Sequence, residues 1–139
     1  MTWKRALALA AGVALLASAG WVLSGTLYKL QCSDKECGHT AELGLGGTML
    51  AVHKTGFCVN CGDFVAVGWD RPRDGVTPKN PEIKPVGQVW LPMTGQVKPL
   101  YPCPKCKQPF LPIDSIEELK CCPKCKKPTL TAKVSVMYD

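Results

Sequence analysis

Eight of the nine cysteines in this 139-residue chain stand in four close pairs, and this feature limits the possible folds more than any other. The pairs are Cys32/Cys37, Cys58/Cys61, Cys103/Cys106 and Cys122/Cys125. Aromatic residues make up only 7% of the chain, and much of its 46% apolar content falls in the first thirty residues. Little apolar surface remains for a large core, so something besides apolar burial must stabilise the rest of the chain.

The turn Cys-Pro-Lys-Cys-Lys is written twice, at Cys103–Lys107 and at Cys122–Lys126. Fifteen residues separate the two cysteine pairs, which is within the spacing of a four-cysteine zinc site. Both sulfurs of a Cys-x-x-Cys turn point to one side, so two facing turns complete a tetrahedron of sulfur ligands around Zn²⁺. The repeat therefore predicts one zinc site, held by Cys103, Cys106, Cys122 and Cys125.

The first half of the chain carries a looser version of this pattern. Its cysteine pairs have gaps of four and two residues and are separated by twenty residues, still within the zinc range. Gly38 and Gly62 directly follow the second cysteine of each pair, where a glycine lets the backbone turn back. We therefore expect two Zn²⁺ per chain, with iron as the alternative metal; the second site would be held by Cys32, Cys37, Cys58 and Cys61.

These patterns resemble the zinc-ribbon family, and the Cys-x-x-Cys-Gly of Cys58–Gly62 is similar to rubredoxin. The resemblance covers Leu30–Trp69 and Leu100–Tyr138. It implies a small, metal-stabilised β fold, but it says little about function because ribbons occur in many unrelated assemblies. Lys107 and Lys126 stand where rubredoxin has glycine, which favours zinc over iron in the second module.

The resulting organisation has four parts along the chain. We expect a membrane anchor at 1–29, a first ribbon at 30–69, a linker at 70–99 and a second ribbon at 100–139. The linker carries six prolines and should be largely extended. Within it, Gly87–Trp90 and Gly95–Lys98 flank a short turn and are expected to pair as a small hairpin.

Local patterns predict a few further elements. Leu130–Tyr138 alternates apolar and polar residues with the period of a strand. Asp63–Trp69 and Thr48–Val52 also have strand-like composition. Asp114–Leu119 is expected to form one helical turn, capped by Asp114 or Ser115.

The segment Ala6–Tyr28 contains 23 residues without a charge. As a helix it would reach about 35 Å, enough to cross a hydrocarbon core of about 30 Å. This predicts a single-pass transmembrane helix in contact with membrane lipid. A cleaved signal peptide is the alternative, because Ala17-Ser18-Ala19 has the small residues of a cleavage site. The length of the apolar run favours a retained anchor.

The expected location is the cell (inner) membrane. Lys4 and Arg5 precede the apolar run, so the positive-inside rule places the N-terminus in the cytoplasm and the body on the extracytoplasmic side. The free cysteines argue for the opposite orientation, because an oxidising compartment converts thiols into disulfides. Metal-bound thiolates are partly protected from oxidation, so the two observations are compatible.

Other roles for the cysteines and histidines follow from the same spacing. Disulfides are the alternative to metal, although Cys-x-x-Cys disulfides are mostly redox-active rather than structural. His39 and His53 are not expected to be ligands, because four sulfurs already fill each site. Cys121 is the spare cysteine, a bystander or a substitute for Cys122 as ligand.

Charge and motifs exclude several classes of function. Two four-sulfur zinc sites would lower the formal charge of +6 to roughly +2, and no basic stripe with aromatics appears, which argues against nucleic acid. No Ser/His/Asp set, acid pair or phosphate loop suggests an enzyme or a small-molecule substrate. We expect a non-catalytic accessory subunit of a larger membrane complex; electron transfer of the rubredoxin type, thiol–disulfide redox and metal handling are the alternatives. The apolar anchors for a partner would be Trp69, Trp90, Leu91 and Met93.

Overall fold

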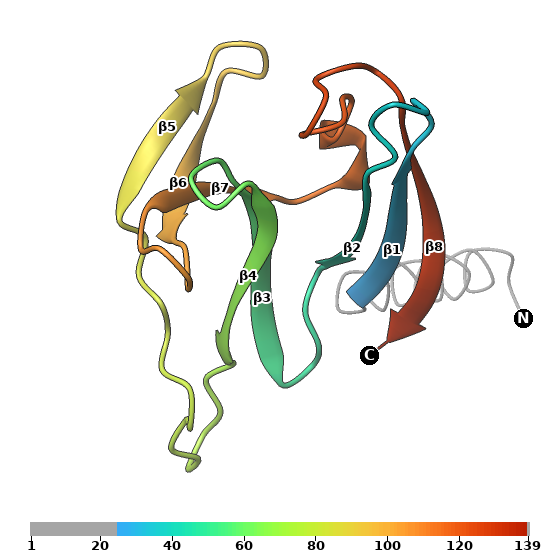
Figure 1. The fold of residues 1–139 in the computed structure, drawn as a ribbon. Coiled ribbons are helices and arrows are strands. Elements are labelled where there is room, and N and C mark those ends of the chain that lie inside the picture. The colour runs from blue at the N-terminus through green and yellow to red at the C-terminus, as the bar shows by residue number, and fades with distance from the viewer. Residues whose placement is uncertain (1–24, 139) are drawn as a thin grey trace, which may run out of the picture.

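The computed structural model describes residues 25–138, which form eight β-strands and one short 3-10 helix (Figure 1). In chain order they are β1 Gly25–Cys32, β2 Thr40–Leu45, β3 Ala51–Cys58, β4 Asp63–Asp70, β5 Gly87–Leu91, β6 Gln96–Pro102, β7 Pro109–Ile113, the 3-10 helix η1 Ile116–Glu118 and β8 Leu130–Tyr138. The chain is thus a small, β-rich protein, as expected.

Most of the predicted membrane anchor, residues 1–24, lies outside the described residues. Within 25–138, no helix has the length and apolar character needed to cross a membrane. The predicted end of the span at Tyr28 is wrong, because Gly25–Tyr28 already belong to β1. Gly25 pairs with β8 and Thr26–Tyr28 pair with both β2 and β8, which provides backbone partners without a helix.

The strands form two antiparallel sheets, and all strands of the second sheet lie between the second and third strands of the first along the chain. The three-stranded sheet has the order β2-β1-β8, so β8 returns from the far end of the chain to pair with β1. The five-stranded sheet has the order β4-β3-β7-β6-β5. Figure 1 shows this return as the red β8 beside the blue β1. We call β1, β2 and β8 the outer ribbon, and β3 to β7 the inner ribbon.

The predicted modules at 30–69 and 100–139 are therefore not the units of the structure. In the outer ribbon, β1 from the first predicted module pairs with β8 from the second, for example Leu30 with Ala132. In the inner ribbon, β3 pairs with β7, for example Thr55 with Ile113. The reason is topological: a hairpin needs a further strand to bury its apolar face, and that strand need not be the next one along the chain.

The inner ribbon has a core of aromatic and branched side chains. Val65, Val67, Trp69, Tyr101 and Phe110 are buried together, and the Trp69 and Tyr101 rings lie 5.7 Å apart at 31°. Trp69 is only 8% exposed. Its predicted role as a surface anchor is wrong, because β4 directs this side chain into the sheet core.

The outer ribbon has a smaller core that it shares with the inner ribbon. Leu30, Leu43 and Leu45 are its buried residues. Phe64 of β4 and Ile113 of β7 pack against them. The two ribbons are consequently joined by apolar packing as well as by the chain.

Most of the predicted local elements are present. β8 and β4 match their predicted strands, the β5–β6 hairpin matches the predicted hairpin, and η1 occupies the predicted helical turn. Thr48–Val52 is a correction, because β3 begins only at Ala51. The Thr48 hydroxyl accepts hydrogen bonds from the N–H groups of Leu50 and Ala51, at 3.2 and 3.0 Å, and so forms a turn instead.

A buried lysine fastens the inner ribbon to the segment that leads back to the outer one. Lys98 of β6 lies 2.9 Å from Asp114 and 2.8 Å from Glu118. Burial disfavours its charge, but the hydrogen bonds that the amine donates to Glu118 and Asp114 outweigh this and raise the pKa of Lys98. The charged amine therefore holds η1 against β6.

Candidate metal centres

Eight cysteines gather into two groups of four. In each group the sulfurs all lie within 4.8 Å of one another. The outer centre is formed by Cys32, Cys37, Cys122 and Cys125, and the inner centre by Cys58, Cys61, Cys103 and Cys106. Each group could hold a metal ion, and together they use all eight predicted ligands.

The grouping of these ligands differs from the prediction. We expected Cys32, Cys37, Cys58 and Cys61 in one site and Cys103, Cys106, Cys122 and Cys125 in the other. The structure instead joins the first pair to the fourth and the second to the third. Strand pairing is the cause, since β8 brings the fourth pair to β1, and β7 brings the third pair to β3.

The distances between sulfurs fit a tetrahedral metal site. With a Zn–S bond of about 2.3 Å, the sulfurs of a tetrahedron stand about 3.8 Å apart. In the outer centre, Cys32 lies 3.7 Å from Cys125 and Cys37 lies 3.8 Å from Cys122. In the inner centre, the corresponding distances are 3.5 Å for Cys58–Cys106 and 3.8 Å for Cys61–Cys103.

The same distances argue against disulfides. A disulfide requires about 2.05 Å between the sulfurs, and all nine cysteines are free thiols in this structure. One member of each pair is buried and the other half-buried. A metal ion bound here would be shielded by protein on one side and approachable on the other.

The four turns that carry the sulfurs share one backbone conformation. The residue after the second cysteine has a positive φ in each turn, and its N–H bonds the carbonyl oxygen four residues earlier, at 2.8 to 2.9 Å. This residue is Gly38 (φ 55°), Gly62 (φ 67°), Lys107 (φ 64°) or Lys126 (φ 65°). The two lysines therefore adopt the conformation for which glycine is better suited.

The shared conformation explains the repeated turn. Each centre consists of one turn that ends in glycine and one Cys-Pro-Lys-Cys-Lys turn. The two copies at Cys103–Lys107 and Cys122–Lys126 are equivalent halves of different centres, rather than two halves of the same centre. The repeat reflects two ribbons of similar design, one inserted into the other.

The Cys32–Cys37 turn departs from the other three. The carbonyl oxygen that accepts from Gly38 belongs to Asp34, which occupies the place of the first cysteine elsewhere. The ligand sulfur comes from Cys32, two residues earlier and at the end of β1. This shift accounts for the four-residue gap between Cys32 and Cys37.

Each centre is also bridged by an ion pair that the sequence did not reveal. In the inner centre, Lys105 lies 3.0 Å from Asp63, and this contact lowers the pKa of Asp63. In the outer centre, Lys127 pairs with Asp34 and lowers the pKa of Asp34. In both cases an aspartate from the glycine turn meets a lysine from the lysine turn, so the pair joins the two halves of the centre.

Backbone amides favour ionisation of one thiol in each centre. The N–H of Gln108 bonds the Cys106 sulfur and lowers the pKa of Cys106 to about 6. The N–H of Lys127 does the same for Cys125, whose pKa falls to about 7. These two thiols therefore ionise more readily than an ordinary cysteine, and a metal ion binds the thiolate form.

The opposite shift occurs at a second thiol of each centre. Although the N–H of His39 bonds the Cys37 sulfur, burial and the neighbouring thiols raise the pKa of Cys37 to about 12. Hydrogen bonding with Cys106, together with burial, raises the pKa of Cys61 to about 12. A divalent cation would remove the repulsion between thiolates, so its binding would release protons.

The remaining candidate ligands are not part of either centre. Only cysteines make up the two groups, and neither includes His39, His53 or Cys121. Cys121 is exposed next to Cys122. Thr129, which the sequence did not single out, places its hydroxyl 3.1 Å from the Cys32 sulfur, where it can donate to a thiolate.

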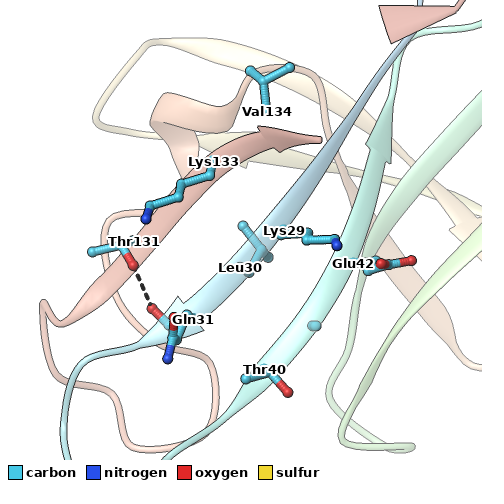
Figure 2. Close-up of a pocket in the computed structure, with 9 residues that line it drawn as sticks. Lys29, Leu30, Gln31, Thr40, Glu42, Thr131, Lys133 and Val134 are labelled. Atoms are coloured by element: carbon cyan, nitrogen blue, oxygen red, sulfur yellow. Dashed lines mark hydrogen bonds between the residues drawn. The ribbon is translucent and has the colours of Figure 1, made fainter. Parts of the chain in front are cut away.

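Away from the cysteines, an open cavity of about 350 Å³ lies on the outer ribbon (Figure 2). Lys29, Lys133 and Glu42 project from neighbouring strands around it, and Thr131 bonds the carbonyl oxygen of Gln31 at 3.0 Å. This face offers charged and hydroxyl groups, but no cysteine and no histidine. It is separate from the metal centres.

Comparisons with family models, with curated proteins and with solved structures give no match to this chain.

Proposed function

We propose that the chain is a non-catalytic, membrane-anchored protein with two zinc ribbons, acting as an accessory subunit of a larger membrane complex. The observation that carries the proposal is the β5–β6 hairpin, which forms one edge of the five-stranded sheet (Figure 1). Trp90 is 61% exposed and Met93 is 91% exposed. Trp90 lies opposite the exposed Val97 on the same face of the hairpin.

Exposed apolar groups of this kind are typical of interaction surfaces. Aromatic residues often contribute most of the binding energy at protein interfaces, and contiguous apolar patches are unusual on isolated soluble proteins. A cavity of about 520 Å³ adjoins the hairpin, lined by Leu91, Pro92 and Met93 and rimmed by Glu118 and Lys120. A partner could insert an apolar side chain here while its polar groups meet the charged rim.

Zinc is the metal we propose for both centres. The sulfur tetrahedra match its geometry, and zinc is the usual metal of four-cysteine structural sites. Four thiolates on Zn²⁺ carry a net charge of −2. The lysines of the two Cys-Pro-Lys-Cys-Lys turns and their neighbours offset this charge: Lys105, Lys107, Lys124, Lys126 and Lys127.

Elemental analysis of the purified full-length protein tests the metal. Two zinc ions per chain are expected. One iron per chain with visible thiolate-to-iron absorption would move the proposal to electron transfer of the rubredoxin type. Zinc that exchanges readily with a weak chelator would favour metal handling instead.

The membrane attachment rests on the sequence, in which uncharged residues continue from Ala6 to the start of β1 at Gly25. We propose that this segment is retained and that the body faces the extracytoplasmic side. Extraction of membranes with alkaline carbonate should leave the chain in the pellet. A periplasmic-reporter fusion at the C-terminus should be active, whereas a cytoplasmic reporter should not.

Recovery from native membranes in mild detergent tests the accessory role. Wild-type protein should run with a partner, and Trp90→Ala should reduce the fraction assembled at least tenfold, because an interfacial tryptophan commonly contributes 2 kcal/mol or more (about thirtyfold). Val134→Ser is the matched control: Val134 is also exposed but lies on β8 of the other sheet. Both variants should keep two metals. A monodisperse monomer from native membranes would refute the role.

A further inference from the structure

The start of β1 marks the place where the uncharged N-terminal segment joins the described fold. Thr26 lies opposite Leu45, the last residue of β2, on one side and opposite Met137 of β8 on the other. The β2–β3 turn, residues 46–50, therefore begins beside this point. In Figure 1 the start of β1, the end of β8 and this turn all lie in the lower part of the view.

The β2–β3 turn is tied to the first part of the long β4–β5 loop. The N–H of Arg71 donates to the carbonyl of Leu50, and its Nε donates to the carbonyl of Thr48, both at 2.9 Å. Asp70 fixes the other side of the loop by accepting from the backbone N–H groups of Lys79 and Asn80. Residues 46–50 of the turn and 71–80 of the loop thus form one surface, which we call the lower face.

Apolar side chains are exposed on the lower face. Met49 of the turn is 65% exposed, and Leu50 and Val76 are also exposed. None of these side chains belongs to either core of the two ribbons. Contiguous exposed apolar groups often mark a contact with a membrane or a partner, so the lower face is suited to an apolar surrounding.

Cations stand among these apolar groups. A cavity of about 250 Å³ is lined by Arg71, Arg73 and Lys79, with Leu50 and Val76 beside them. The carboxylate of Asp70 also lines it, but it is engaged by the backbone donors of the loop. Within residues 25–138, none of the three cations forms an ion pair with a carboxylate.

We propose that the lower face rests on the membrane surface and that this cavity receives the phosphate of an anionic phospholipid headgroup. Arg71, Arg73 and Lys79 supply the positive charge, while Met49 and Leu50 enter the region between headgroups and acyl chains. Apolar groups flanked by basic ones are the combination that binds anionic bilayers. The inference rests on the proposed anchor, which would bring this face to the bilayer, and it names the lipid class that the body contacts.

Amide hydrogen exchange on the full-length protein in nanodiscs tests the proposal. Peptides covering 46–50 and 71–80 should exchange at least fivefold more slowly in discs containing phosphatidylglycerol than in phosphatidylcholine discs, since each basic group near an anionic surface contributes about 1 kcal/mol, or about fivefold. Arg73→Glu combined with Lys79→Glu should abolish the difference. The matched control is Lys84→Glu with Lys133→Glu, two exposed lysines outside the lower face, which should keep it.

Other outcomes have defined meanings. Equal exchange in the two kinds of disc, with the chain still integral to the membrane, would overturn the headgroup site and leave the anchor standing. A chain that fails to enter discs at all would refute the anchor and the inference with it. Protection of the same peptides by inorganic phosphate in phosphatidylcholine discs would show a free-anion site and overturn the lipid contact. Unchanged exchange of β4 in every variant confirms that the fold is intact.

Discussion

Because one metal centre lies inside the loop closed by the other, the two should bind metal cooperatively. The outer centre joins Cys37 to Cys122, which are 85 residues apart, and the inner centre joins Cys58 to Cys106, which are 48 apart. When the inner centre is formed, the loop that the outer centre must close shrinks from 85 to 85 − 48 = 37 residues. Loop-closure entropy with a 3/2 exponent then favours the second closure by about 0.7 kcal/mol, or about 3.5-fold.

The perturbation is removal of one centre at a time at matched positions. Cys103→Ser with Cys106→Ser removes the inner centre, and Cys122→Ser with Cys125→Ser removes the outer one. Competition with a chromophoric chelator at fixed pH gives the zinc constant of each remaining centre and the two-metal constant of the wild type. The wild-type constant divided by the product of the two single-site constants is the cooperativity factor, and linkage makes it the same in both directions.

We expect a factor of at least about 3.5, because shared packing adds to the entropy of closure. Phe64→Ala removes one cross-ribbon contact and should lower the factor towards the value set by entropy alone. A factor of 1 would refute the reasoning. That value is the one expected if the ligands were grouped sequentially, since two separate loops share no residues and neither shortens the other.

Three further predictions concern single residues. Cys121→Ser should leave two metals bound, because this thiol is exposed and outside both centres; loss of zinc measured by elemental analysis would contradict the ligand assignment. Lys107→Gly should stabilise the fold by about 0.5 kcal/mol in thermal unfolding, because glycine removes the strain of the positive φ and this gain exceeds the cost of its extra entropy in the unfolded chain. Lys126→Gly should be near neutral, because it also removes the contact of the Lys126 amine with the ring of Phe57, at 5.9 Å. Gly56→Ala should destabilise by about 2 kcal/mol, since the new Cβ would stand 2.2 Å from a backbone oxygen of β7; an unchanged melting temperature would show that the β3–β7 contact is not tight.

Most of the features that depend on short stretches of sequence were predicted correctly. Cysteine spacing identified all eight residues that gather into the two groups, and alternation identified β8 over its whole length. Both signals are local, because a turn of four residues or a strand of nine is specified by its own residues. The glycines at Gly38 and Gly62 likewise marked the positive φ that the turns require.

Which cysteine pairs share a metal centre could not be predicted from such local signals. Spacing alone permits either grouping of the four pairs, and the repeat at Cys103 and Cys122 pointed to the wrong one. What decides the grouping is the pairing of β1 with β8 and of β3 with β7, which joins residues far apart in the chain. Trp69 illustrates the same limit. As a tryptophan beside the proline-rich segment it suggested an exposed anchor, but the pairing of β4 with β3 places its side chain in the core.

The nested topology bears directly on the proposed role as an accessory subunit. The β5–β6 hairpin and the loop of residues 71–80 lie at opposite ends of the inner ribbon in Figure 1. Between them, the sheet is fixed by the inner centre, by the shared core and by Lys98, which ties β6 to η1. A surface held at one end on a membrane can therefore present the other end to a partner at a set distance. When one metal is removed, we expect the distance between the two ends of the inner ribbon to become less well defined before the chain unfolds. The reason is that the remaining centre then has a longer free loop to restrain. Assembly with the partner should consequently fail at chelator concentrations that still leave β3 and β4 protected from amide exchange. If assembly and the protection of β3 and β4 were lost at the same chelator concentration, the metals would maintain the fold and have no separate effect on the spacing.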